Sequence, residues 1–146
     1  MSNRVDNSSL ATLTEQYVAV WNEADQQARV KRIAELWTTE GTHVLVDPPQ
    51  VIRETAAALN FPTPYMSVRG HRELDARITR AYEMFVGSGE FVFRSRGAAQ
   101  RLTEGVVGIG WDMVAADGSV GGAGYDVLAL DENGRIHADH QYIGPA

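Results

Sequence analysis

One aspartate on an otherwise apolar strand is the residue in this sequence best suited to acid–base chemistry. Asp126 alternates with Leu128 and Leu130 in the segment 124–130, so the three side chains share one strand face. A carboxylate on an apolar face is costly unless it is paired, protonated or placed at the wall of a cavity. We therefore expect Asp126 to be a neutral acid that donates one hydrogen bond to a ligand.

A second acid stands at the end of an earlier predicted strand. Thr42–Asp47 alternates with period two and is followed by two prolines, which cannot donate to a sheet ladder. Asp47 shares its strand face with Leu45 and could act as a base at the mouth of a pocket. An aspartate before proline is also a common turn residue, and both roles stay open.

The last predicted strand carries three polar side chains on one face, His137, Asp139 and Gln141. They could bind a ligand, form the polar rim of a cavity or contact a second subunit. His140 points to the opposite face, so one face supplies too few ligands for a metal ion. We expect no metal here.

Aromatic residues recur at the spacing of buried faces. Tyr17 and Trp21 lie one turn apart on the apolar side of a predicted helix, and Tyr17 is the best polar partner for Asp126. Core packing is the alternative role for both. We expect a pocket lined by these residues and by Trp37, Leu45, Asp47, Tyr65, Met66, Phe85, Phe91, Phe93, Trp111, Met113 and Asp126.

Helical periodicity predicts three main helices, at Leu13–Ala24, Arg29–Thr38 and His71–Val86. A capping box at Thr12–Glu15 would begin the first, which leaves residues 1–11 as a loose tail before a single domain at 12–146. We interpret Gln50–Val68, which includes a short predicted helix, as a flap over the pocket mouth.

Period-two alternation predicts four consecutive antiparallel strands after the last helix, including one long strand at Arg101–Val114. The turn Asp131–Gly134 joins the final two strands, because Asn-Gly readily adopts positive φ. Segregated helices and strands indicate an α+β fold. We expect a cone-shaped, curved, mixed or antiparallel sheet with three helices on its concave face.

Composition narrows the function classes. The 146 residues carry a formal net charge of −6, which disfavours nucleic acid and anionic membranes as partners. The absence of cysteine excludes disulfides and thiolate chemistry. No apolar run is long enough to span a bilayer and no signal-peptide pattern is present, so a cytoplasmic location is the expectation. No glycine-rich phosphate loop opens a helix, and no cofactor is expected.

From Thr12 to Gly144 the sequence resembles the nuclear transport factor 2-like superfamily, and within it the SnoaL-like polyketide cyclases and ketosteroid isomerases. The resemblance is carried by short motifs: Tyr17–Asn22, Ala34–Trp37, Val46–Pro48, Gly70 before a helix, Gly124–Val127 and Asn133–Ile136. It implies a cystatin-like α+β barrel and a homodimer formed through the outer face of the sheet.

For chemistry, the resemblance to ketosteroid isomerases implies three roles. Tyr17 and a protonated Asp126 would form an oxyanion hole, and Asp47 would shuttle the proton. A buried aspartic acid that stays neutral is an established feature of ketosteroid isomerases. Compared with SnoaL-like cyclases, Asp139 stands at a histidine position and Gln141 at an aspartate position. Limonene epoxide hydrolase chemistry is discounted, because Gly110 stands where that family has arginine.

Three functions follow as hypotheses. The first is isomerase- or cyclase-type proton transfer on a hydrophobic carbonyl compound. The second is non-catalytic binding of a small hydrophobic molecule, and the third is a structural dimerisation domain, because fold alone does not settle function. If the oxygens of Tyr17, Asp47 and Asp126 converge on one space, the first is favoured.

Overall fold

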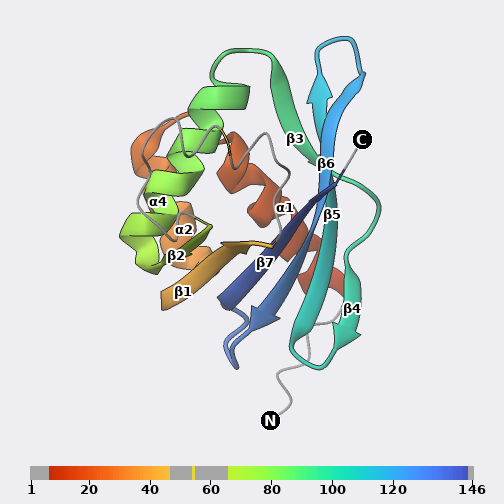
Figure 1. The fold of residues 1–146 in the computed structure, drawn as a ribbon. Coiled ribbons are helices and arrows are strands. Elements are labelled where there is room, and N and C mark those ends of the chain that lie inside the picture. The colour runs from red at the N-terminus through yellow and green to blue at the C-terminus, as the bar shows by residue number, and fades with distance from the viewer. Residues whose placement is uncertain (1–6, 47–53, 55–65, 145–146) are drawn as a thin grey trace.

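A computed structural model describes residues 7–46, 54 and 66–144 of the chain. Its three main helices are α1 (Asn7–Asn22), α2 (Gln26–Leu36) and α4 (Gly70–Ala81), and α4 runs on into a π-helical turn, η1 (Tyr82–Val86). All of them lie on one side of a curved sheet (Figure 1). The helices thus cover the concave face, as the sequence predicts.

The described sheet has seven strands in an open, mixed arrangement. They are β1 (Trp37–Leu45), β2 (Ser67–Arg69), β3 (Phe91–Ser95), β4 (Gln100–Thr103), β5 (Val106–Ala115), β6 (Val120–Leu130) and β7 (Ile136–Gly144). The order is β2-β1-β7-β6-β5-β3, with β4 pairing with β5. Only the β1–β7 pairing is parallel among these strands. The predicted α+β class and the antiparallel run β3-β5-β6-β7 are confirmed.

The β6–β7 hairpin fixes the register around Asp126. Gly134 has φ 83°, and its amide donates to the carbonyl of Asp131 at 3.0 Å. The Asp131 carboxylate also accepts from the amides of Asn133 and Arg135, each at 2.9 Å. This turn pairs Asp126 with Gln141 across the ladder. The turn, which the local sequence predicts, therefore places Asp126 and Gln141 side by side.

The first two helices differ from the predicted ones at their ends. α1 begins at Asn7, so the loose tail expected for residues 1–11 is wrong for 7–11; buried Leu10 extends the apolar face by a turn. Thr14 donates to the carbonyl of Leu10 within the helix. α2 begins after Asp25, whose carboxylate caps the amide of Ala28. It ends at Leu36, so Trp37 opens β1 instead of lying on a helix.

Two strand predictions are also corrected. The single strand predicted at Arg101–Val114 is two strands, β4 and β5, because Gly105 turns the chain with φ 73°. The expected shared face of His137, Asp139 and Gln141 is broken, because the β6–β7 register shifts between Ala129 and Leu130. His137 is exposed while Asp139 and Gln141 are buried.

The core lies between the helices and the concave face. Asn22, at the end of α1, anchors this helix to β3 by binding both backbone groups of Phe93 at 2.8 Å. The buried cluster joins all three helices to β5, β6 and β7 and contains Leu10, Leu13, Tyr17, Val20, Trp21, Ile33, Leu36, Trp37, Leu74, Ile78, Val107, Ile109, Leu128, Leu130 and Ile136. Most of the predicted α1 face is therefore core.

Some expectations fall on residues outside the described ranges. Asp47, Tyr65 and almost all of the predicted flap belong to this group. Within the described ranges, the helices are all too short or too polar to cross a bilayer.

Candidate functional site

The hydroxyl of Tyr17 lies between two carboxyl groups inside the molecule. Tyr17 projects from α1, and its oxygen is 2.7 Å from Asp126 Oδ2 on β6 and 2.6 Å from Asp139 Oδ2 on β7. The relative exposure is 2% for Tyr17 and 0% for each aspartate. The predicted pairing of Tyr17 with Asp126 is confirmed, and Asp139 joins it as a third member.

This arrangement requires an extra proton. A tyrosine hydroxyl carries one hydrogen, so it can donate to only one of the two carboxyl oxygens. The other short contact must be made by a protonated carboxyl that donates to the tyrosine oxygen. The three groups therefore hold two protons between them. The buried trio then carries one negative charge instead of two.

Asp126 is held as the hydrogen-bond acceptor of the trio. The indole Nε1 of Trp111 donates to Asp126 Oδ1 at 2.7 Å. The amide Nε2 of Gln141 lies 3.1 Å from Oδ1 and 3.3 Å from Oδ2. An N–H group can only donate, so Asp126 accepts hydrogen bonds from Trp111 and Gln141. The expectation that Asp126 is a neutral acid stays a prediction, and its contacts with Trp111 and Gln141 are those of an acceptor.

Gly124 makes the Trp111 contact possible. A Cβ at Gly124 would lie 2.2 Å from the Trp111 ring, so any side chain there would displace the indole. Trp111 faces the helices, as its alternation with Ile109 predicts, and is only 9% exposed. The hydrogen bond to Asp126 is an additional role that apolar patterning did not reveal.

The neutral acid is Asp139. Burial and then the neighbouring Asp126 raise the pKa of Asp139 well above its usual value. The hydrogen bond with Tyr17 and the charge of Arg77 oppose this rise in the pKa without cancelling it, and Asp139 Oδ1 has no partner in the described part of the chain. Burial, followed by the two carboxyls, also raises the pKa of Tyr17. Asp139 therefore donates to Tyr17, and Tyr17 donates to Asp126.

A histidine that the sequence did not single out borders this trio. His43 on β1 is 1% exposed, and its Nε2 lies 3.9 Å from Asp139 Oδ2 and 4.0 Å from Asp126 Oδ2. Burial, followed by Arg77 and His140, lowers the pKa of His43 well below its usual value. The ring is thus neutral.

His43, Asp126 and Asp139 could in principle hold a metal ion, because their ligand atoms lie within 4.8 Å of one another. The tautomer of His43 argues against it. Arg77 Nη1 lies 3.0 Å from His43 Nδ1, and a guanidinium can only donate, so Nδ1 accepts and Nε2 carries the proton. A metal-binding histidine instead needs a bare nitrogen towards the metal and an N–H towards its support.

Aromatic rings surround the trio. The ring centroids of Trp21 and Trp37 lie 6.3 and 5.9 Å from that of Tyr17. Phe93 joins Trp21 to Trp111, at 6.4 and 5.5 Å. Of the predicted ligand-binding residues, the structure gathers Trp21, Trp37, Phe93, Trp111, Asp139 and Gln141 here.

The remaining predicted lining is more distant. Phe85 contacts Phe93 and so forms a second layer, at a centroid distance of 6.5 Å. Phe91 lies against Gly121, and Met113 packs beside Gly122, at the far end of the β5–β6 pair. Met66 is half-buried, and its carbonyl accepts from the amide of Leu45.

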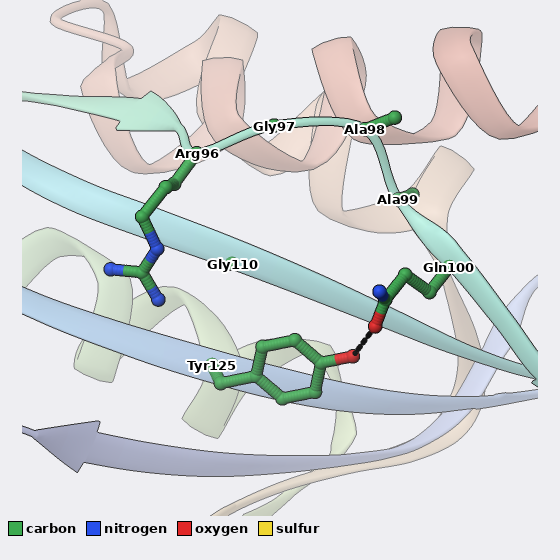
Figure 2. Close-up of a pocket in the computed structure, with 7 residues that line it drawn as sticks. All are labelled: Arg96, Gly97, Ala98, Ala99, Gln100, Gly110 and Tyr125. Atoms are coloured by element: carbon green, nitrogen blue, oxygen red, sulfur yellow. Dashed lines mark hydrogen bonds between the residues drawn. The ribbon is translucent and has the colours of Figure 1, made fainter.

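A separate pocket lies on the outer face of the sheet. It measures about 510 Å³ and is lined by Arg96, Gly97, Ala98, Ala99, Gln100, Gly110 and Tyr125 (Figure 2). Gly110 and Tyr125 alternate with Trp111 and Asp126, so they face away from the acid–tyrosine trio. None of the residues predicted to line an apolar pocket belongs to it.

Two signals could have pointed to the missed residues. His43 shares a strand face with Leu45 and Asp47 by simple alternation. Arg77 stands three residues after buried Leu74 on α4, at the helical spacing of the inner face. Neither signal names the partner, because the His43–Arg77 contact joins a strand to a helix across 34 residues of sequence.

Comparisons with known proteins place this geometry in a common fold. Neither family models nor curated proteins gave a match. Among solved structures, a candidate isomerase of the SnoaL-like family from Agrobacterium tumefaciens matches with TM-score 0.72 and 22% identity, over 94% of this chain and 98% of that one. The epoxide hydrolase/cyclase-like enzyme SalBIII, of pyran ring formation in salinomycin, matches with TM-score 0.59 and 14% identity, over 95% and 93%.

A de novo designed protein with the nuclear transport factor 2 fold matches as well, with TM-score 0.64 and 13% identity, over 97% of this chain and 89% of that one. Other matches are described as nuclear transport factor 2-like and ketosteroid isomerase-like. The chain therefore has the nuclear transport factor 2-like, SnoaL-like fold, and the predicted resemblance is confirmed at the level of fold.

Proposed function

We propose that this protein binds a small hydrophobic carbonyl compound beside Tyr17, Asp126 and Asp139 and catalyses isomerase- or cyclase-type proton transfer on it. The observation that carries the proposal is the pair of short contacts from the Tyr17 hydroxyl to two buried carboxyls. A buried phenol and a neutral carboxylic acid are both donors that can stabilise an enolate without carrying charge in the resting state.

The chain of donors suits this role. Asp139 donates to Tyr17, and a ligand oxygen near them would receive the two hydrogen bonds that now run within the trio. Exclusion of water strengthens such bonds where negative charge develops. Asp126, which keeps its hydrogen bonds from Trp111 and Gln141, would not itself donate to the ligand.

The base remains Asp47, by resemblance. Asp47 lies outside the described residues, and the described segment before it ends at Val46. The amide of Val46 donates to the carbonyl of Gln141 at 2.8 Å, and Gln141 binds Asp126. The residue after Val46 in the sequence is Asp47. Removal of a proton α to the carbonyl is the step assigned to it.

Non-catalytic binding is the second candidate, favoured by one observation. Both oxygens of Asp126 already accept hydrogen bonds from the chain itself, which is what a purely structural polar cluster would require. The two candidates differ in turnover, because a binder would hold the same compound without exchanging its protons.

The test uses a bicyclic β,γ-unsaturated ketone, whose conversion to the conjugated isomer is followed by ultraviolet absorbance. Tyr17→Phe should lower the rate about 100-fold, the usual cost of one lost oxyanion donor. The matched control is Tyr142→Phe, on a tyrosine that is 47% exposed, and should leave the rate unchanged. Binding without turnover by the wild-type protein would favour the non-catalytic binder.

A further inference from the structure

The ring of His43 is fixed in direction, and its Nε2 has no acceptor among the described residues. Arg77 fixes its ring through the contact to Nδ1, and the same guanidinium nitrogen donates to the backbone carbonyl of His43 at 3.1 Å. Because Nδ1 is an acceptor, the proton of the neutral ring is on Nε2. Within the described ranges, that Nε2 has no hydrogen-bond partner.

An unpaired acceptor belongs to the same cluster. Asp139 Oδ1 is buried and also lacks a partner among the described residues. His43 Nε2 is 3.9 Å from the other oxygen of this carboxyl, which is too far for a direct hydrogen bond, so a ligand oxygen beside the two groups could bind both. Buried polar groups are nearly always paired, so a donor and an acceptor left open together indicate a ligand atom that can serve both.

We propose that His43 is a ligand-binding residue and that the ligand carries a hydroxyl group on an apolar frame, which accepts from His43 Nε2 and donates to Asp139 Oδ1. A plain carbonyl could satisfy only the histidine, and an ammonium group only the acid. The surrounding rings of Trp21 and Tyr17 suit the apolar frame, with Trp21 at 5.3 Å from the His43 ring centroid. This inference rests on the proposed function, because it concerns the same site, and it names the substrate class as hydroxylated or enolised.

Arg77 is the positioning residue in this account. It contacts the ring nitrogen that faces away from the trio, and so selects the tautomer that points N–H towards the ligand. A carboxylate or carbonyl at the same place would select the opposite tautomer and a bare Nε2. The charge and geometry of Arg77 thus decide whether His43 donates or accepts.

The binding test compares 2-naphthol with 2-methylnaphthalene, which replaces the hydroxyl by a methyl group of similar size. The wild-type protein should prefer 2-naphthol by about tenfold, the value of one net hydrogen bond. His43→Phe should abolish that preference and change the affinity for 2-methylnaphthalene less than about twofold. His43→Gln, which keeps an N–H, should retain part of it. His137→Phe, at an exposed histidine on β7, is the matched control.

The outcomes separate this inference from the proposed function. If Tyr17→Phe loses the preference while His43→Phe keeps it, the proposed site stands and the role of His43 is wrong. If the wild-type protein shows no preference for the hydroxyl, the role of His43 is overturned, and the proposed function is then decided by turnover of the ketone alone.

A spectroscopic reading covers the case in which His43→Phe does not fold. In protein labelled with ¹⁵N-histidine, the two-bond ¹H–¹⁵N couplings of the His43 ring should show the tautomer with its proton on Nε2. Its Nε2 resonance should move with 2-naphthol and stay fixed with 2-methylnaphthalene. Arg77→Met should give a mixture of tautomers. An Nδ1–H tautomer in the wild-type protein, or an Nε2 signal indifferent to 2-naphthol, would overturn the proposal.

Discussion

Two tyrosine hydroxyls, one on each face of the sheet, make hydrogen bonds of similar length with opposite consequences. Tyr17 reaches the carboxyls of Asp126 and Asp139 in the core, at 2.7 and 2.6 Å. Tyr125 reaches Gln100 Oε1 at 2.9 Å on the outer face (Figure 2). Water is available to the second pair and excluded from the first. Only the Tyr17 hydroxyl and its two carboxyl partners must therefore share protons.

Two aspartates repeat the contrast. Asp112 binds Arg96 at 2.9 Å on the outer face, where the side chains are 24% and 49% exposed. Asp126 is fully buried, and its donors among the described residues, Tyr17, Trp111 and Gln141, are all neutral. Exposed charges need little from their neighbours, because water solvates them. A buried one depends on every donor around it, so its environment, not its residue type, creates the chemistry.

The largest expected effect is at Asp126. Asp126→Leu leaves the buried N–H groups of Trp111 and Gln141 without their acceptor, whereas the Tyr17 hydroxyl keeps its contact with Asp139. The free energy of unfolding should fall by about 3 kcal/mol or more, since each stranded buried group costs about 1–3. Asp126→Asn keeps an acceptor and can donate to Tyr17, so its loss should be about 1 kcal/mol or less. Denaturant unfolding measures both.

The outer-face counterpart is Asp112→Ala, which breaks the ion pair with Arg96. Its loss should stay within about 1 kcal/mol, as for other exposed pairs. Equal losses for Asp126→Leu and Asp112→Ala would remove the distinction between the two faces.

The two tyrosines give the next effect. Tyr17→Phe removes the link between the carboxyls, and the unfolding free energy should fall by about 1–3 kcal/mol. Tyr125→Phe should cost less than about 0.5 kcal/mol, because water replaces the lost hydroxyl. Thermal unfolding of the two variants measures both losses. A larger loss for Tyr125→Phe would show that the outer pocket, not the trio, is the ordered polar site.

The smallest effect is a dependence on pH. The pKa of Asp139 is raised in the folded protein, so its contribution to stability is complete below the ordinary value of 3.8 and is lost as pH rises through the folded pKa. Asp139→Asn cannot titrate. The wild-type unfolding free energy minus that of Asp139→Asn should therefore fall with pH above 3.8, by up to about 1.4 kcal/mol per pH unit.

His43 does not confuse this comparison. Its lowered pKa costs stability as pH falls below 6.5, and that loss is common to both proteins. A difference between wild type and Asp139→Asn that is constant with pH would mean that Asp139 is charged in the fold.

Local patterns predicted the fold and the Tyr17–Asp126 pair well. A period of 3.6 placed Tyr17 on the inner face of α1, and a period of two placed Asp126 with Leu128 on β6. The Asn-Gly turn then set the hairpin register. These features follow from short stretches of sequence, which is why they survive without knowledge of the rest of the chain.

Tertiary contacts decided what the sequence missed. Trp37 has a helical spacing from Ile33, yet pairing of β1 with β7 draws it into the sheet. Asp126 accepts from Trp111 and Gln141, and no local sequence pattern predicts those donors. The Arg77–His43 contact likewise depends on how α4 crosses β1.

The most direct test of the shared proton is infrared difference spectroscopy of wild type against Asp139→Asn at neutral pH. A protonated carboxyl has a C=O stretch well separated from the carboxylate bands. We expect this band in the wild-type protein, its loss in Asp139→Asn, and its persistence in Asp112→Asn. A wild-type spectrum without a protonated-carboxyl band, or one whose band survives in Asp139→Asn, would contradict the account.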